Sequence, residues 1–337
     1  MPTDTVLREL LARQLEAWLP AALQRARRAT LALAYAGTDA GGADAALRAV
    51  ADLADRLRGF RLTILVLADG DQALPARLGA IEATLPAEVA VHVMPGDPGR
   101  LPVALKAAGA VGAPLLTVAH GADPTPALLA AARAGRPADL LLVTGPGAPL
   151  RPALDAAGFP LVTEVDLVAA TAPTGPTTGA GEARPATIPA QPVGGAGEPA
   201  GAAGAVVGVP PSDGWRVAFA TSSDRSLQAF KDALWAVASG MSLCDPADPR
   251  GRPLDVVAEP DPDPLARELL AELDRHGPGT VTELRRHALT ATPYRAADAT
   301  RAVTGLLDSG AATRDPEHGR LGGDVLITAA PGGRPAA

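Results

Sequence analysis

Residues 215–237, WRVAFATSSDRSLQAFKDALWAV, carry a β-rich pattern that passes directly into a helical one. The segment Trp215–Thr221 alternates and is rich in β-forming residues, so it predicts a strand. Ser222, Ser223 or Asp224 can cap the helix that follows. This helix has one apolar face, formed by Leu227, Phe230, Leu234 and Val237. Because aromatic residues are only 3% of the chain and concentrate here, the stretch predicts a strand–helix unit that builds the core.

Upstream of this unit, short apolar runs alternate with helical segments. The predicted strands are Thr30–Tyr35, Arg61–Leu67, Val89–Met94, Pro114–Ala119, Ala138–Thr144 and Pro160–Ala170. The predicted helices between them are Ala43–Leu57, Ala73–Leu85, Leu101–Ala108 and Pro126–Ala134. Such alternation is typical of right-handed βαβ units. With Trp215–Thr221 as a seventh strand beside the sixth, it predicts an α/β, Rossmann-like, mostly parallel sheet over residues 1–243.

The first helical pattern runs from Asp4 to Arg28 and contains Pro20, which predicts a break or kink. Arg25, Arg27 and Arg28 end it. Basic residues suit the negative end of a helix dipole. These arginines therefore indicate either a solvated helix end or a contact with an anionic partner.

Three segments have the composition of unfolded chain. Residues 171–213 are low-complexity Ala, Gly, Pro and Thr, and predict a disordered insertion because they bury too little large apolar surface. Residues 244–262 are rich in Pro and Asp and predict a linker. Residues 331–337 predict a disordered tail.

The pattern changes from residue 263 onward. Three short helices are predicted at Pro264–His276, Thr280–Leu289 and Pro293–Leu307. Ala311–Arg314 and Asp324–Ala329 flank a polar turn and predict a β-hairpin. Three helices followed by a hairpin predict a winged helix-turn-helix domain over residues 263–330.

Composition excludes several classes of protein and site. The net charge of −7 gives no general attraction to nucleic acid. Cys244 is the single cysteine, so neither an internal disulfide nor a multi-cysteine metal site is expected, and no metal ligands are assigned. The sequence predicts no signal peptide and no membrane span. A cytoplasmic protein without membrane contact is the expectation.

Three patches resemble the three-Cys-motif partner protein family. They are LRELLARQLEAWLP followed by a strand and YAG, the strand–helix unit with its Lys-Asp-aliphatic-Trp helix, and TPYRAADATRAVTGLLDSG. The resemblance implies a class I methyltransferase-type Rossmann-like domain with a C-terminal winged helix. It also implies association with a radical-SAM-like protein that bears a three-cysteine motif, and it implies no substrate.

The same resemblance places S-adenosylmethionine over the glycine turn after the first strand. Gly37 matches this turn. Asp39 stands where the family has a second glycine, and Leu33 stands where it has an acidic residue that binds the ligand's amino group. These departures weaken the case for a cofactor, and a plain loop is the competing interpretation.

The carboxyl ends of the next strands supply the other candidate residues. Asp69, with Asp71 as a substitute, matches the acid that takes the ribose hydroxyls, and Asp97 matches the position that contacts adenine. His120 lies where the family has an Asp-Pro-Phe turn, and a histidine can act as a general base near neutral pH. Either aspartate is equally interpretable as an exposed loop side chain, and for His120 that interpretation is the favoured one.

Two function hypotheses follow from these residues. One is a non-catalytic binding or partner protein on a degenerate methyltransferase scaffold, with no cofactor expected. The other is an active S-adenosylmethionine-dependent methyltransferase. A winged-helix DNA-binding protein is a further alternative, but the third helix of that domain offers only Arg295 and Arg301, which Asp298 and Asp308 offset.

Overall fold

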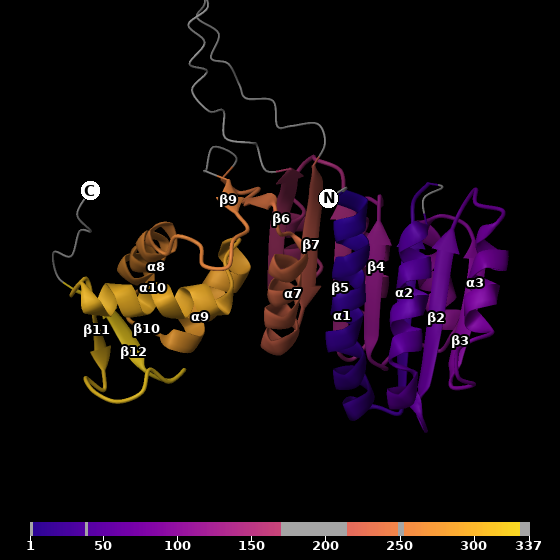
Figure 1. Ribbon diagram of the computed structural model, residues 1–337, viewed down its shortest axis with the longest axis horizontal. Helices are drawn as coiled ribbons and strands as arrows, with labels where there is room; N and C mark the ends of the chain where they lie inside the picture. Colours follow the sequence, from indigo (N-terminus) through magenta and orange to yellow (C-terminus); the bar gives the residue numbers. More distant parts are fainter. Residues whose placement is uncertain (1–2, 38–39, 170–213, 249–252, 331–337) are drawn as a thin grey trace, which may run out of the picture.

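A nine-stranded sheet dominates the computed structural model, which describes residues 3–37, 40–169, 214–248 and 253–330. Its strand order is β3-β2-β1-β4-β5-β7-β6-β8-β9 (Figure 1). The strands are β1 Arg28–Tyr35, β2 Arg61–Ala68, β3 Val89–Pro95, β4 Leu115–His120, β5 Ala138–Thr144, β6 Leu161–Ala169, β7 Trp215–Thr221, β8 Met241–Cys244 and β9 Leu254–Asp255. The predicted α/β class with a mostly parallel, Rossmann-like sheet is confirmed.

Direction in the sheet changes only at its far end. Strands β1 to β5 are parallel to one another, whereas β7 is antiparallel to both β5 and β6. The predicted pairing of the last two strands is therefore confirmed. β8 and β9 extend the sheet beyond β6, so part of the predicted linker 244–262 is an edge strand.

Helices cover both faces of the sheet. The helices of one face are α1 Thr3–Arg25, α2 Gly41–Asp52, α3 Leu74–Glu82 and α7 Asp224–Val237, and those of the other are α4 Leu101–Ala107, α5 Pro126–Ala132 and α6 Arg151–Ala156. A short 3-10 turn at Ala54–Leu57 follows α2, and another at Pro98–Arg100 precedes α4. In Figure 1, α1, α2 and α7 lie in front of the sheet.

The sheet has an apolar core on each face, because the side chains of a strand alternate between the two faces. Successive side chains of β1 point to opposite faces. Leu31 and Leu33 enter the core beneath α1, α2 and α7, whereas Ala32 and Ala34 enter the core beneath α4, α5 and α6. Both faces are buried, which explains why these strands read as continuous apolar runs.

The first and seventh helices show how the sequence forms the front layer. α1 runs through Pro20 without ending, because Leu10, Leu15 and Leu19 hold its apolar stripe in the core. For α7, Ser223 is the cap: its side chain accepts a hydrogen bond from the backbone N–H of Ser226 at 3.2 Å.

A second domain follows the sheet. It comprises α8 Asp263–His276, α9 Val281–Ala291, α10 Ala296–Asp308 and a three-stranded sheet of β10 Gly279–Thr280, β12 Leu326–Ala329 and β11 Ala312–Asp315. A capping box starts α9, in which Thr280 and Glu283 each accept a hydrogen bond from the other's backbone. The order of three helices followed by an antiparallel pair agrees with the predicted elements.

Two predicted segments cannot be assessed. The insertion 171–213 and the tail 331–337 lie outside the described residues. Within the described ranges, no helix is long and apolar enough to cross a membrane.

Candidate functional site

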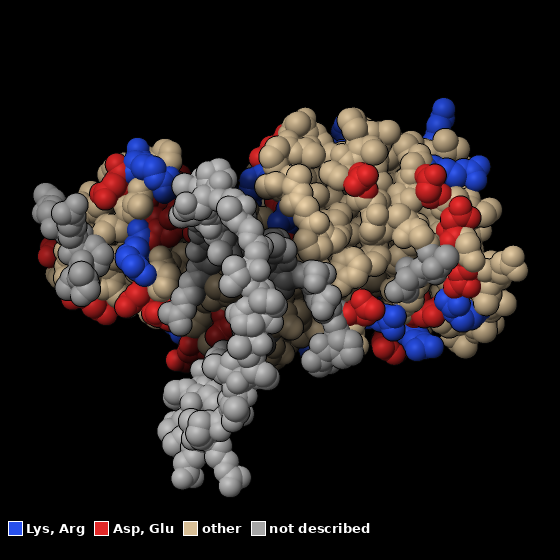
Figure 2. All heavy atoms as spheres, turned by 90° about the horizontal axis from the view of Figure 1, so that it is seen from above, with Lys and Arg blue, Asp and Glu red and all other residues tan. Residues whose placement is uncertain are grey.

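The carboxyl edge of the parallel strands brings the predicted site residues to one side of the molecule. Gly37 follows β1, Asp69 follows β2, Asp97 follows β3 and His120 ends β4. The chain crosses from one side of the sheet to the other between β1 and β4, the place where open α/β sheets bind ligands. Seen from this edge, the visible surface of the first domain is mostly uncharged, with its arginines and lysines towards the rim (Figure 2).

The glycine turn after β1 is occupied by the chain's own tyrosine. Gly37 has a φ of +87°, which favours glycine. Farther along the turn, a Cβ added at Gly42 would lie 2.7 Å from the hydroxyl oxygen of Tyr35. The space left by this missing side chain, at the first turn of α2, is therefore filled by the Tyr35 ring rather than open to a ligand. Asp39 lies outside the described residues.

The acidic candidates differ in how far they are engaged. Asp69 is exposed directly after β2. Asp71, its substitute, accepts a hydrogen bond from Arg77 at 2.8 Å, which lowers the pKa of this carboxyl group. Asp97 accepts the backbone N–H of Gly99 at 2.7 Å and so caps a 3-10 turn. Of these three aspartates, Asp71 and Asp97 have such local structural contacts, and Asp69 is the one left exposed. Leu33, by contrast, is fully buried in the core.

His120 belongs to a row of rings at this edge. Its ring centroid lies 4.8 Å from that of Trp215 and 6.1 Å from that of Tyr35. Trp215 is the first residue of β7, whose reversed direction brings it to the carboxyl ends of β1 and β4. Sequence reasoning gave His120 no neighbours, because it predicted neither the antiparallel direction of this strand nor its place beside β5.

Beneath these rings is a small, mainly apolar cavity. Its volume is about 50 Å³, and its floor and walls include Val118, Leu141 and Val143 with residues of α1. Pockets that hold drug-sized ligands are typically 300–1,000 Å³. The cavity therefore has room for a few atoms rather than for a nucleoside.

A buried ion pair stiffens the neighbouring strands. Arg216 donates two hydrogen bonds to Asp166, at 2.7 and 2.8 Å, and a third to the backbone oxygen of Gly147. Glu164, 3.4 Å from Arg216, accepts the backbone N–H groups of Leu150 and Arg151 at the start of α6. These polar groups satisfy one another, so they support the edge and offer no free reactive group.

The second site is the junction of the two domains, and it contains the Lys-Asp-aliphatic-Trp motif. Lys231 donates a hydrogen bond to the backbone oxygen of Thr292 at 2.6 Å. One turn later, the indole N–H of Trp235 donates to the backbone oxygen of Pro293 at 3.0 Å. Burial lowers the pKa of Lys231 from 10.5 to about 7. The motif therefore binds the segment that leaves α9.

A third donor comes from α6, where Arg151 donates to the backbone oxygen of Thr290. The last carbonyl groups of a helix lack partners within it and carry partial negative charge. Lys231 and Arg151 are hydrogen-bond donors from the first domain that meet these carbonyls. In the middle of α9, Arg286 forms an ion pair at 2.7 Å with Asp224, the first residue of α7. Together these contacts hold the two domains in one arrangement.

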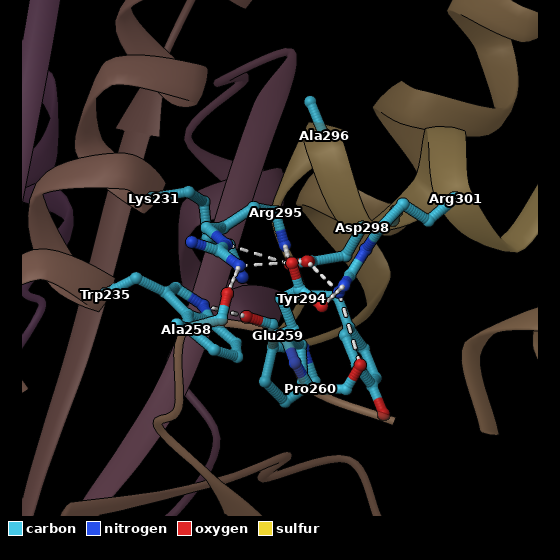
Figure 3. Close-up of polar contacts among 12 residues, drawn as sticks. Lys231, Trp235, Ala258, Glu259, Pro260, Tyr294, Arg295, Ala296, Asp298 and Arg301 are labelled. Atoms are coloured by element: carbon cyan, nitrogen blue, oxygen red, sulfur yellow. Dashed lines mark hydrogen bonds and ion pairs between the residues drawn. The ribbon is translucent and has the colours of Figure 1, made fainter. Parts of the chain in front are cut away.

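The start of α10 faces the same junction (Figure 3). The Arg295 guanidinium carbon lies 4.4 Å from the centre of the Trp235 ring, and this side chain also contacts buried Asp298 at 2.9 Å. Arg301 binds Asp298 at 2.9 Å and the backbone oxygen of Pro260 at 3.2 Å. Both arginines considered for DNA contact are therefore engaged with Asp298, the Trp235 ring or the segment that joins the domains.

Comparisons with known proteins do not assign the chain to a family. No model of a protein family matches the chain, and no curated protein matches it significantly. No cluster of His, Cys, Asp and Glu suited to a metal ion occurs in the part of the chain that the structure describes. The carboxyl edge and the domain junction are therefore the observations from which a function is inferred.

Proposed function

We propose that this chain is a non-catalytic binding or partner protein built on a degenerate methyltransferase scaffold. The resemblance of its motifs to the three-Cys-motif partner family makes a radical-SAM-like protein its proposed partner. The strand order β3-β2-β1-β4-β5-β7-β6, in which β7 alone is reversed, is typical of class I methyltransferase-type sheets and supports this scaffold. The C-terminal domain is proposed to be a winged helix with α10 in the position of the recognition helix.

The observation that carries the proposal is the Tyr35 ring over Gly42. A cofactor's methionine end would need the backbone of this glycine turn to be accessible. Here the ring fills that space, Leu33 offers the ligand's ammonium group no carboxylate, and the cavity is about 50 Å³. Asp69 is the feature that favours the second candidate, an active methyltransferase, because it remains exposed where the ribose would lie.

Calorimetric titration of the full chain with S-adenosylmethionine tests this proposal. We expect no heat of binding at micromolar ligand, because the groups that would bind the methionine and adenine ends are absent or engaged. A micromolar dissociation constant that Asp69→Ala raises about tenfold, equivalent to about 1.4 kcal/mol, would establish cofactor binding and reject the degenerate scaffold. Glu88→Ala, which removes an acid before β3 at the opposite edge, is the matched control.

The contacts of Arg295 and Arg301 at the junction also allow a prediction of how strongly the protein binds DNA. Arg295 and Arg301 are paired with Asp298, so we expect only weak binding that disappears between low and physiological salt. Fluorescence anisotropy of a labelled duplex measures this. Binding that persists at physiological salt and is lost on Arg301→Ala would contradict the inference that these arginines serve structural contacts. Arg314→Ala, on the predicted wing, is the comparison variant.

A further inference from the structure

The amino edge of the sheet, opposite the carboxyl edge, collects arginines from segments far apart in the sequence. Arg28 begins β1, Arg61 begins β2 and Arg136 lies just before β5. Arg27 precedes β1, and Arg133 ends α5 on the same side. All are exposed. The basic end of α1, interpretable from sequence as a contact with an anionic partner, is thus one part of a larger basic surface.

Backbone hydrogen bonds fix these arginines in a row. The N–H of Arg61 donates to the backbone oxygen of Arg27 at 2.8 Å, and the N–H of Thr30 donates to that of Pro114 at 2.9 Å. The N–H of Arg136 donates to the backbone oxygen of Ala113 at 2.8 Å. The row therefore crosses four adjacent strands, β2, β1, β4 and β5. At about 4.8 Å per strand it is roughly 14 Å long, which equals about four residues of extended peptide.

These side chains are available to an external anion. No ion pair joins Arg27, Arg28, Arg61 or Arg136 to an acidic residue within the described ranges. Two acids at this edge are already paired, Asp55 with Arg58 and Asp224 with Arg286. The other acids near this edge are the exposed Asp52 and Asp155, the half-buried Glu88 and the buried Asp139 of β5. In a chain of net charge −7, four exposed arginines along one edge that no ion pair among the described residues neutralises are a candidate contact for an anion.

One end of the row opens into a hollow of about 330 Å³ between Arg133, Arg136, Phe159 and Ser222. Arg133 is held in place there. It donates to the backbone oxygen of Ala157, and its guanidinium carbon lies 5.6 Å from the centre of the Phe159 ring. A cation that is already ordered loses little conformational entropy when it binds a carboxylate. The hollow can therefore receive one acidic side chain.

The middle of the row is apolar. Val111, in the turn before β4, is 61% exposed and lies between the arginines of β1 and those before β5. A bare row of cations would suit any polyanion, but an exposed valine between cations matches a peptide whose acidic residues flank an apolar one. The overall negative charge also repels a long nucleic acid more than a short acidic segment.

We propose that the amino edge, from Arg61 to Arg136, is a docking surface for an extended acidic segment of a partner protein. This surface lies at the opposite end of the strands from the proposed degenerate cofactor site. Either proposal can therefore fail while the other stands, because S-adenosylmethionine binding is read at one edge and peptide binding at the other.

Fluorescence anisotropy with the full chain tests the proposal, using as the probe a labelled peptide with the sequence Glu-Ser-Leu-Ser-Glu, whose glutamate and leucine side chains share one face when the peptide is extended. We expect saturable binding that weakens with salt. The double charge reversal Arg28→Glu with Arg136→Glu should weaken it by about tenfold or more. Arg48→Glu, an equal change of charge per site at an exposed side chain of α2, should leave it nearly unchanged, and circular dichroism verifies that each variant is folded.

Three outcomes of the peptide experiment would overturn the proposal. They are no saturable binding of the peptide, equal weakening by Arg48→Glu and by the reversals at the edge, and equal binding of a peptide with serine in place of glutamate. Tighter binding of a DNA duplex than of the peptide, lost in the same edge variant, would instead assign the surface to nucleic acid and also reject the proposal.

Discussion

Trp235→Ala is expected to destabilise the protein by about 3–5 kcal/mol, the range measured for truncation of buried aromatic side chains. Trp235 is 4% exposed, and its ring packs in the main core while its N–H reaches the backbone oxygen of Pro293. The substitution also removes the surface on which Arg295 lies. Since a domain is typically stable by only about 5–15 kcal/mol, a low yield of soluble protein is expected.

Urea unfolding followed by circular dichroism measures this effect. Trp215→Ala is the matched control, because Trp215 is only half-buried at the carboxyl edge and should cost less. Trp235→Phe separates the two roles of the side chain: it keeps a ring but removes the donor, with an expected loss of about 1 kcal/mol. A Trp235→Ala variant that unfolds at the same urea concentration as the wild type would show that the ring does not support the core.

Loss of this contact should also separate the two domains. Trp235, Lys231 and Arg151 are the donors that meet the end of α9, and two of them lie on one turn of α7. If they couple the domains, Trp235→Ala should turn one cooperative transition into two. The Lys-Asp-aliphatic-Trp motif is thereby explained as a structural contact within this chain rather than as an exposed surface for another protein.

The sheet could be predicted because each strand carries its own local signal. The runs at 30–35, 61–67 and 138–144 lie within one or two residues of β1, β2 and β5. Such runs are buried on both faces, so apolar side chains occupy nearly every position. The aromatic strand–helix unit was likewise recognisable from its two periods, which the structure reproduces as β7 and α7.

The reversed direction of β7 and its pairing with β5 could not be predicted, because they depend on contacts between distant segments. Nothing local in Trp215–Thr221 indicates that the strand runs against β5, and therefore nothing placed Trp215 beside His120. β9 has only two residues, too few for a periodic signal. The six-residue helix α6 lacks a long amphipathic pattern for the same reason.

The sequence indicated where the candidate residues lie, but not whether the space beside them is open to a ligand. The rule that ligands lie at the carboxyl ends of parallel strands placed Gly37, Asp69, Asp97 and His120 at one edge, as the structure does. That Tyr35 fills the space at Gly42 is a tertiary contact, which spacing alone does not reveal. Lys231, by contrast, had a usable signal, because its helical spacing from Leu227 and Leu234 puts a rare lysine on the apolar face.

Asp139 is the residue expected to make stability depend most clearly on pH. It lies at the start of β5, 1% exposed, and accepts a hydrogen bond from the Thr221 hydroxyl group. Burial raises its pKa from 3.8 to about 6, against the opposing effects of that hydrogen bond, the Arg25 charge and Ser226. Its other carboxylate oxygen has no hydrogen-bond partner among the described residues, which fits a group that the fold prefers protonated.

The sign of the effect follows from linkage. The folded protein binds this proton more tightly than the unfolded chain, so the stabilisation is complete below about pH 4 and is lost as the pH rises through about 6. A change from 3.8 to about 6 corresponds to about 3 kcal/mol in total. About 2 kcal/mol of this falls between pH 4.5 and pH 7.5, where the unfolded carboxyl is already almost fully ionised.

Asp139→Asn should remove this dependence, because the amide keeps the shape and an acceptor for Thr221 but cannot ionise. Urea unfolding at pH 4.5 and at pH 7.5 gives two differences in unfolding free energy between variant and wild type. Relative to the wild type, the variant should gain about 2 kcal/mol on going to the higher pH. Asp155→Asn, at an exposed acid near the end of α6, should show no such gain. If the two variants respond alike, the pH dependence does not arise from the buried carboxyl group of Asp139.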